Sequence, residues 1–365
     1  VQVQSLCRSA PAPADCPPLP PRNLSTLVDI ARWRAQCQPH DTAFTFLLDG
    51  QQQEAHLSYC ELDRRARAIA AELSARRARG QRVLVVFDPG LEYRAAIFGC
   101  LYAGAIAVPV YPPDPFRAYT TLPRLQSILA DAQSRRVLTS AETARWASSV
   151  AGALGGAEVI AAESVPAEAA DQWKPVPIRQ EDIALLQYTS GSTGAPRGVI
   201  ITHANLMHNL AGLHRMDMPG AVAVCWLPPY HDMGLVGGIM LPVHSGRQVV
   251  LLPPLRFVQR PVRWLQAISR YRARTSAAPN FGYELCLRKI TVAECEGLDL
   301  SCWRVAISGA EPVRAETIQR FSERFAPYGF RREAFFPAYG MAESTLLISS
   351  GTRGDRPLMC NFSAQ

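Results

Sequence analysis

The residues with the clearest capacity for chemistry lie between positions 189 and 198. An apolar run at 183–186 precedes them and predicts a buried strand, and another apolar run at 199–201 follows. The segment itself supplies glycines, hydroxyl side chains and one fixed positive charge. Its candidate ligand-binding residues are Thr189, Ser190, Gly191, Ser192, Thr193, Gly194 and Arg197.

This composition suits a polyphosphate ligand. Glycine lets the backbone approach a ligand closely, and successive backbone N–H groups in such a turn form an anion-binding concavity. Threonine and serine hydroxyls add donors, and Arg197 adds a planar cation. The alternative is a flexible Gly/Ser connector, which we discount because linkers rarely follow directly on an apolar strand. The Walker pattern is absent, since Gly198 follows Arg197, which argues against an ordinary P-loop NTPase.

Predicted strands and helices alternate along the chain, which is typical of parallel sheets covered by helices. The predicted strands are 83–87, 105–110, 137–138, 222–226, 249–252 and 305–307, with a hairpin over 44–57. The predicted helices are one capped by Ser25, one capped by Thr202 over 203–216, and others over 61–76, 91–103, 122–132, 261–271, 280–288 and 316–325. We therefore expect an α/β fold of two subdomains, with mostly parallel sheets flanked by helices in αβαβα layers.

Composition also divides the chain. Prolines crowd residues 1–22, which predicts an extended leader. A first α/β subdomain is expected over 23–180 and a second, carrying the phosphate loop, over 181–350, because the Ala-rich region 140–180 is less regular. Residues 351–365 would begin a linker or an insertion.

Bulk composition excludes several classes of protein. Hydrophobic residues make up 48% and charged residues 19% of the 365 residues, as in a folded globular protein. No stretch approaches ~20 consecutive apolar residues, so no membrane span is expected. The net charge of +7 comes from scattered arginines without a basic, aromatic-rich run, so nucleic acid is not an expected partner. Ten cysteines without regular spacing fit a reducing cytoplasm.

Four loops follow predicted strands, around 189–198, 228–234, 308–312 and 338–344. Ligands bind at the carboxyl ends of strands in open parallel sheets, so these loops should gather at one face. The third and fourth could sandwich a purine between a flat backbone surface and an aromatic ring. Read separately, the third is an ordinary turn and Tyr339 a half-buried core residue. The candidate nucleotide-binding residues are Ser308, Gly309, Ala310, Glu311, Pro312, Tyr339, Gly340, Met341 and Ala342.

Two further side chains could take part in chemistry. Glu343 near a triphosphate would need a cation between the charges, and Mg2+ prefers one or two carboxylates plus phosphate oxygens. The alternative is a surface glutamate without a ligand. His231 invites an acid/base or metal interpretation, but a lone histidine is usually structural, and no second histidine lies three or four residues away. A G-x-S-x-G elbow is absent, so a hydrolase triad is unsupported.

The phosphate loop resembles that of the adenylate-forming superfamily of acyl-CoA ligases, luciferases and peptide-synthetase adenylation domains. The superfamily usually has lysine at the Arg197 position, and arginine keeps the charge. Tyr339-Gly340-Met341-Ala342-Glu343 resembles the superfamily's Y-G-x-x-E motif. The resemblance implies that Tyr339 stacks on adenine, that Glu343 holds Mg2+, and that His231 lies near the reacting carboxylate and the α-phosphate.

Within the superfamily the chain is most similar to the fatty acyl-AMP ligases, through the stretches 99–104, 108–113, 226–235 and 279–286. Pro229 is a minor departure from that pattern. An alkyl chain needs apolar walls without bulky intrusions, so the segments 233–240 and 277–281 are candidates for an acyl tunnel. The candidate substrate-binding residues are His231, Met233, Gly234, Gly237, Ala277, Asn280 and Phe281.

The resemblance implies ATP-dependent activation of a fatty acid to acyl-AMP, with release of pyrophosphate and transfer to the phosphopantetheine of an acyl carrier protein, which can be fused in the same polypeptide. It also implies that a mobile C-terminal domain with a catalytic lysine follows position 365, and that a subfamily insertion begins near 351–357. Two alternatives remain open: a long-chain acyl-CoA ligase, and a non-catalytic fragment that binds nucleotide or acyl groups.

Overall fold

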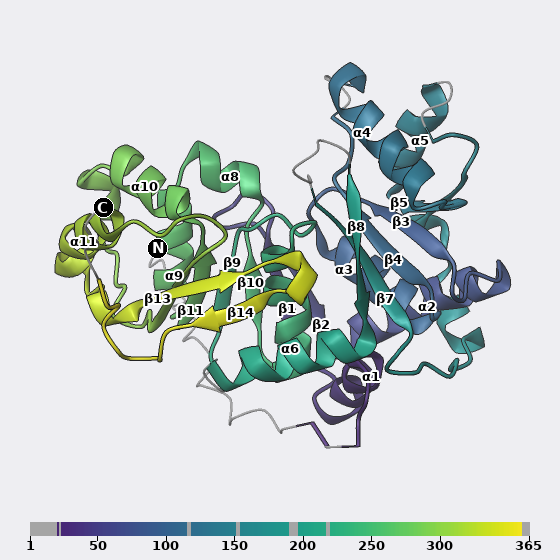
Figure 1. The fold of residues 1–365 in the computed structure, drawn as a ribbon, viewed down its shortest axis with the longest axis horizontal. Helices are drawn as coiled ribbons and strands as arrows, with labels where there is room; N and C mark the ends of the chain where they lie inside the picture. Colours follow the sequence, from purple (N-terminus) through teal and green to yellow (C-terminus); the bar gives the residue numbers. More distant parts are fainter. Residues whose placement is uncertain are drawn as a thin grey trace, which may run out of the picture.

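The computed structural model describes residues 20–21, 23–114, 118–150, 154–189, 196–216 and 220–359. Its strands form an eight-stranded sheet and a six-stranded sheet, which stand side by side with helices packed around them (Figure 1). Neighbouring strands pair in parallel except for β1 with β2, β13 with β14 and β7 with β8. The expected α/β fold with mostly parallel sheets is confirmed.

The eight-stranded sheet has the order β14-β13-β12-β11-β9-β10-β1-β2. Its strands are β1 (Thr42–Leu47), β2 (Glu54–Ser58), β9 (Ala223–Cys225), β10 (Val249–Leu251), β11 (Thr275–Ala278), β12 (Val305–Ser308), β13 (Phe335–Gly340) and β14 (Leu347–Ser350). The six-stranded sheet has the order β6-β5-β3-β4-β7-β8. Its strands are β3 (Arg82–Val86), β4 (Ile106–Val110), β5 (Arg136–Thr139), β6 (Glu158–Ala161), β7 (Ile183–Thr189) and β8 (Arg197–Thr202).

The helices lie close to their predicted positions where the pattern of apolar residues was clear. The α-helices are α1 (Leu27–Cys37), α2 (Tyr59–Ala75), α3 (Leu91–Tyr102), α4 (Ala118–Asp131), α5 (Ala141–Ser149), α6 (His203–Met216), α7 (Leu241–Ser245), α8 (Pro254–Gln259), α9 (Val262–Arg270), α10 (Asn280–Lys289) and α11 (Ala315–Phe325). A π-helix, η4 (Met233–Met240), was not predicted. The 3-10 turns are η2 (Ala162–Ser164), η3 (Ala167–Gln172), η5 (Ala293–Cys295), η6 (Ala326–Tyr328), η7 (Arg332–Ala334) and η8 (Ala342–Ser344).

Side-chain caps set several helix starts. Thr26, not Ser25, caps α1: its hydroxyl accepts a hydrogen bond from the backbone N–H of Asp29 at 3.2 Å, and the Asp29 carboxylate accepts one from the N–H of Thr26 at 3.0 Å. Ser58 caps α2 in the same way, so the helix begins two residues earlier than predicted. Thr202 accepts from the N–H of Asn205 at 3.2 Å, as its predicted role at the start of α6 requires.

The two sheets do not divide the chain at residue 180. The hairpin β1–β2 lies far earlier in the sequence but belongs to the eight-stranded sheet, where β1 pairs with β10 in parallel. Conversely, β7 and β8 follow residue 180 and close the edge of the six-stranded sheet beside β4. Each sheet therefore takes strands from both sides of the expected boundary, because pairing between distant segments decides sheet membership.

Aromatic packing fixes the helices α9, α10 and α11 near one another. Trp264 on α9 contacts Trp303 edge to face at a centroid distance of 5.1 Å, and Tyr283 on α10 contacts Phe321 on α11 at the same distance. All four side chains are fully buried. Burial of each such ring contributes about 1.5–3 kcal/mol, so this cluster is a principal anchor beside the eight-stranded sheet.

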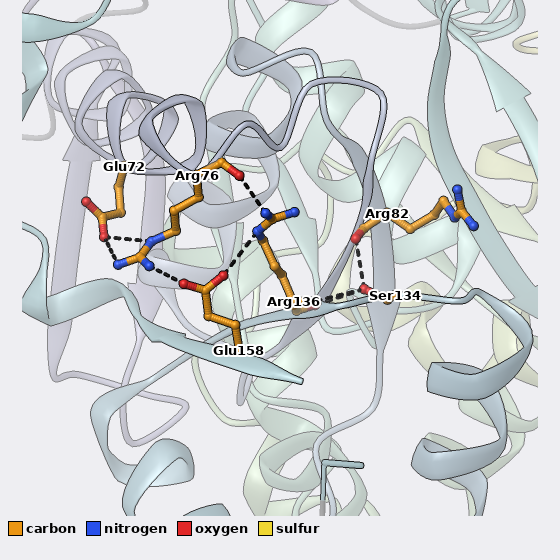
Figure 2. A network of polar contacts seen from close by, with 6 residues as sticks. All are labelled: Glu72, Arg76, Arg82, Ser134, Arg136 and Glu158. Atoms are coloured by element: carbon orange, nitrogen blue, oxygen red, sulfur yellow. Dashed lines mark hydrogen bonds and ion pairs between the residues drawn. The ribbon is translucent and has the colours of Figure 1, made fainter. Parts of the chain in front are cut away.

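A polar network joins α2 to the edge of the six-stranded sheet (Figure 2). Arg76 pairs with Glu72 one turn earlier on α2 and with Glu158 on β6. Arg136 on β5 lies 3.2 Å from the same Glu158 carboxylate and donates to the Arg76 carbonyl oxygen at 2.5 Å. The network lies at the surface, so its contribution is the alignment of α2 with the sheet edge more than stability.

Candidate active site

A cavity of about 320 Å³ opens at the carboxyl ends of the central strands of the eight-stranded sheet. All four predicted loop regions contribute at least one residue to its wall. The predicted residues that line it are Thr189, His231, Met233, Gly237, Ala277, Gly309, Ala310, Tyr339, Gly340, Met341, Ala342 and Glu343. The structure therefore brings together side chains that are up to 154 residues apart in the sequence, from Thr189 to Glu343.

The phosphate loop connects two neighbouring antiparallel strands. Thr189 ends β7 and pairs with Arg197, the first residue of β8. Five of the predicted ligand-binding residues lie outside the described residues: Ser190, Gly191, Ser192, Thr193 and Gly194. Thr189 lines the cavity, whereas Arg197 is exposed at the start of β8 and does not line it.

Glycines allow close backbone contacts on both sides of β13. The loop after β12 lies against β13 at Gly309, and the residues before β14 lie against β13 at Gly340. A Cβ at Gly309 would lie 2.6 Å from the carbonyl oxygen of Ala338, and one at Gly340 would lie 1.8 Å from that of Leu346. Ala310 adopts the left-handed region with φ of 64°, a conformation that costs a non-glycine residue free energy and that often occurs at ligand sites. Only residues without side-chain bulk could build this close backbone surface at Gly309 and Gly340.

Tyr339 presents its ring beside this backbone surface. Its side chain is 60% exposed and lines the cavity, so it is not the half-buried core residue of the alternative interpretation. The ring is therefore available to stack on a planar ligand.

Three residues predicted beside Gly309 do not line the cavity. Ser308 is 1% exposed and pairs within the sheet with Ala278 and Pro337. The carboxylate of Glu311 accepts a hydrogen bond from the backbone N–H of Phe281 and so ties this loop to the start of α10. Pro312 is exposed away from the wall.

His231 and Asp232 form an ion pair at the rim of the cavity. Their Nδ1 and Oδ1 atoms are 2.5 Å apart, with Asp232 buried and the His231 side chain 54% exposed. The hydrogen bond to Asp232 raises the pKa of His231, partly opposed by burial, so the imidazolium is favoured. Asp232 also accepts from the backbone N–H of Met233 at 2.7 Å and caps η4. Asp232 was not predicted as a site residue. Its position directly after His231 is the sequence feature that could have indicated it.

Glu343 lies in η8 with its side chain exposed at the cavity. Thr345, two residues on, has a φ of 72° and turns the chain back into β14. The described residues contain no group of three or more His, Cys, Asp or Glu side chains that could enclose a metal ion. A single carboxylate here fits Mg2+ only with phosphate oxygens and water as its other ligands, which is the arrangement that Mg2+ prefers.

The inner wall of the cavity is one face of the sheet. Side chains alternate along a strand, so residues two apart share a face. Val249, Ala223, Thr275 and Val305 form one cross-strand row, and Ala277, Ile307 and Phe336 form the next row toward the carboxyl ends. All seven line the cavity, as do Gly237 and Gly238 of η4. Of these nine residues, Ala277 and Gly237 were predicted individually, and Gly238 lies in the predicted segment 233–240.

Three predicted acyl-wall residues have other roles. Gly234 packs against the backbone, since a Cβ there would lie 2.0 Å from the Pro228 carbonyl oxygen. Asn280 is buried and accepts a hydrogen bond from the N–H of Arg314 at 3.1 Å. Phe281 is 45% exposed and packs edge to face on Trp226. None of the three lines the cavity, so the cavity does not support the acyl-wall role proposed for them.

Residues 31–360 match the AMP-binding enzyme family. The chain belongs to this family.

Among similar sequences, the chain is 43% identical over 347 residues to the medium-chain-fatty-acid–[acyl-carrier-protein] ligase JamA of Moorena producens, covering 93% of this chain and 59% of that protein. It is 39% identical over 354 residues to the putative fatty-acid–CoA ligase FadD21 of Mycobacterium tuberculosis, covering 93% and 60%. The chain thus spans about three fifths of the length of these relatives.

Among solved structures, the fold matches a fatty acyl-adenylate ligase from Legionella pneumophila in complex with acyl adenylate and pyrophosphate. The TM-score is 0.86 at 42% sequence identity, covering 92% of this chain and 58% of that one. An adenylation domain of a keto acid-selecting peptide-synthetase module matches with a TM-score of 0.81 at 23% identity, which supports the fold alone. Within the described ranges, no helix has the length and apolarity needed to cross a bilayer.

Proposed function

We propose that this chain carries the adenylating half of a fatty acyl-AMP ligase. A fatty carboxylate oxygen forms a bond to the α-phosphorus of ATP, the bond from that phosphorus to the β-phosphate bridging oxygen breaks, and pyrophosphate leaves. The observation that carries the proposal is the single cavity that joins Tyr339 and Glu343 at its mouth to the apolar rows of the sheet inside. Adenine and phosphates fit the first part and an alkyl chain the second.

Both reactants are anions, so the protein's task is to position them and to offset their charge. Gly309 and Ala310 would form one wall for adenine and the ring of Tyr339 the other. Thr189 and the loop that follows it would hold the β- and γ-phosphates, with Arg197 at the end of that loop. Mg2+ held by Glu343 would supply charge neutralisation on the pyrophosphate.

His231 would hold the reacting carboxylate near the α-phosphate. Its ion pair with Asp232 favours the imidazolium, which retains a proton on Nε2 when Nδ1 donates to the aspartate. A positively charged imidazole with an N–H donor at the rim of the cavity can contact both the fatty carboxylate and the α-phosphate. We assign no proton transfer to His231, because the attacking oxygen is already a carboxylate.

We further propose that the acyl group passes to the phosphopantetheine thiol of an acyl carrier protein in a reducing, cytoplasmic compartment. The name of the similar JamA protein specifies a medium-chain acid and a carrier protein. All seven described cysteines are free thiols, which fits the compartment.

Two other activities compete with this one. The similar FadD21 protein is named a putative CoA ligase, so the same adenylate could be transferred to CoA. Alternatively, the chain could bind nucleotide or acyl groups without turnover.

Two assays separate the three activities. Fatty-acid-dependent exchange of labelled pyrophosphate into ATP by this chain would exclude the binding-only alternative. Incubation of the full-length protein with fatty acid, ATP and either CoA or a phosphopantetheinylated carrier protein should acylate the carrier and not CoA. Rapid formation of acyl-CoA would overturn the carrier-protein assignment.

A further inference from the structure

One charged side chain lies at the end of the cavity farthest from the nucleotide loops. The parallel strands run toward those loops, and Val249, Ala223, Thr275 and Val305 form the row at the opposite end. Arg247 comes two residues before Val249 and lines the same cavity. It therefore stands beyond the last apolar row, at the amino-terminal edge of the sheet.

The Arg247 backbone is held firmly in this position. Gly246, with φ of 73°, ends α7, and the N–H of Arg247 donates to the Pro242 carbonyl oxygen at 3.1 Å. The Tyr59 hydroxyl donates to the carbonyl oxygen of Arg247 at 3.1 Å. The residue is only 4% exposed, so Arg247 forms a buried part of the cavity wall.

The charge of Arg247 acts on a residue of the cavity wall. Burial raises the pKa of the Cys225 thiol, which lines the cavity two residues beyond Ala223, and the charge of Arg247 is one of the groups that oppose this rise. The Arg247 charge is thus within electrostatic reach of the channel wall above the first row.

We propose that Arg247 closes the distal end of the acyl channel and limits the substrate to fatty acids of medium chain length. This inference rests on the proposed function. The three levels from Val305 through Ile307 to the adenine wall at Gly309 span about 13 Å at the rise of a β-strand, and the alkyl chain would have to fit within this span. A longer chain would have to press its apolar end against a buried guanidinium, and it could not displace that group without removing it from its polar surroundings.

The side walls of the channel do not narrow it at Gly237 and Gly238, so the length of the channel is the dimension that limits the alkyl chain. Gly237 and Gly238 place no side chain in the channel, and a Cβ at Gly237 would lie 3.6 Å from Leu346. A larger side chain at position 237 would therefore cross the channel nearer its mouth. Substitutions at positions 237 and 247 should move the accepted length in opposite directions.

The test measures fatty-acid-dependent pyrophosphate exchange by the full-length protein with saturated acids from hexanoic to octadecanoic acid. The wild type should prefer medium-chain acids. Arg247→Ala should raise kcat/KM roughly tenfold or more for acids just beyond the wild-type limit, because each added methylene then gains an apolar contact. Gly237→Leu should shift the optimum to shorter acids. Arg331→Ala, which removes an exposed arginine, is the matched control and should keep the wild-type profile.

Arg247→Met serves if the alanine variant does not fold, because it fills similar volume with a flexible apolar chain, and it should also gain activity with longer acids. The inference is overturned if both position-247 variants keep the wild-type length profile, or if the wild type uses octadecanoic acid as well as octanoic acid. Exchange with no acid of any length in the wild type would instead overturn the proposed function itself.

Discussion

The side-chain amide of Gln187 donates a hydrogen bond to the backbone carbonyl oxygen of Tyr230 at 2.6 Å, and this contact joins the two sheets at the candidate site. Gln187 lies on β7, two residues before the end of the strand that leads into the phosphate loop. Tyr230 directly precedes His231. Strand β7 leads into the phosphate loop. Through Gln187 it thus also holds the loop after β9 that carries His231.

Removing this contact should impair the site more than the fold. Gln187→Leu keeps the volume but leaves the Tyr230 carbonyl oxygen without its amide donor, at a cost of about 1–3 kcal/mol. We expect a lower melting temperature and a fall in kcat/KM for pyrophosphate exchange. Gln248→Leu is the control, since its amide bonds Thr45 at 2.8 Å away from the cavity, and it should lose stability without a comparable loss of activity. Equal losses of activity in both variants would contradict the coupling.

Asp232→Asn should move the pH dependence of adenylation. Asp232 raises the pKa of His231, so activity that needs the imidazolium persists below that raised value and falls as the pH rises through it. Without the carboxylate the pKa of His231 drops, and the fall should occur at lower pH. A pH profile of kcat/KM measures the shift. An unchanged profile with a uniformly lower rate would mean that Asp232 acts only by capping η4.

Glu343→Gln should reduce adenylation on the order of 10²-fold while leaving the melting temperature close to that of the wild type, because the exposed side chain contributes to charge stabilisation and not to packing. The Mg2+ concentration needed for half-maximal exchange should rise. Glu296→Gln, at an exposed position outside the cavity, is the control. If exchange and its Mg2+ dependence stay as in the wild type, Glu343 is not the metal ligand.

Two glycines of the site should respond very differently to alanine. A Cβ at Gly340 would lie 1.8 Å from the Leu346 carbonyl oxygen, so Gly340→Ala must push β13 and β14 apart and should cost about 1–3 kcal/mol with loss of exchange. A Cβ at Gly237 would make ordinary contact at 3.6 Å. Gly237→Ala should therefore fold with near wild-type stability. Chemical denaturation of both variants checks the contrast, and similar stabilities would show that the hairpin tolerates the added bulk.

Local sequence predicted the elements whose apolar pattern is strong. Strands such as β3 and β4 are continuous apolar runs, and the loops that follow the strands could be recognised by their glycine and proline. By contrast, β11 reads Thr-Ser-Ala-Ala, which lacks the β-branched apolar run typical of a buried strand, and η4 has three glycines that obscure a helix. Neither was predicted as a helix or strand, although parts of both lie in the segments proposed for the acyl tunnel, and both contribute residues to the cavity wall.

The remaining differences between the predicted site and the observed cavity lining concern contacts between distant residues. Asn280 looked like a substrate-binding residue, but it bonds the backbone of Arg314, 34 positions away. Within the loop after β12, the sequence could not distinguish Gly309 and Ala310, which line the cavity, from Ser308 and Glu311, which do not. Strand alternation and the turn at Ala310 decide which side chain faces inward, and neither is visible before the register of the sheet is known.

The most direct test of the whole account is a crystal structure of this chain with a non-hydrolysable fatty acyl-adenylate analogue. We predict the adenine between the Gly309–Ala310 backbone and the Tyr339 ring, the phosphate mimic within hydrogen-bond reach of His231, and the alkyl chain along Ala277 and Ile307 toward Arg247. An analogue bound elsewhere, or one whose alkyl chain leaves the cavity without passing Ala277 and Ile307, would contradict the assignment of this cavity as the site of adenylation.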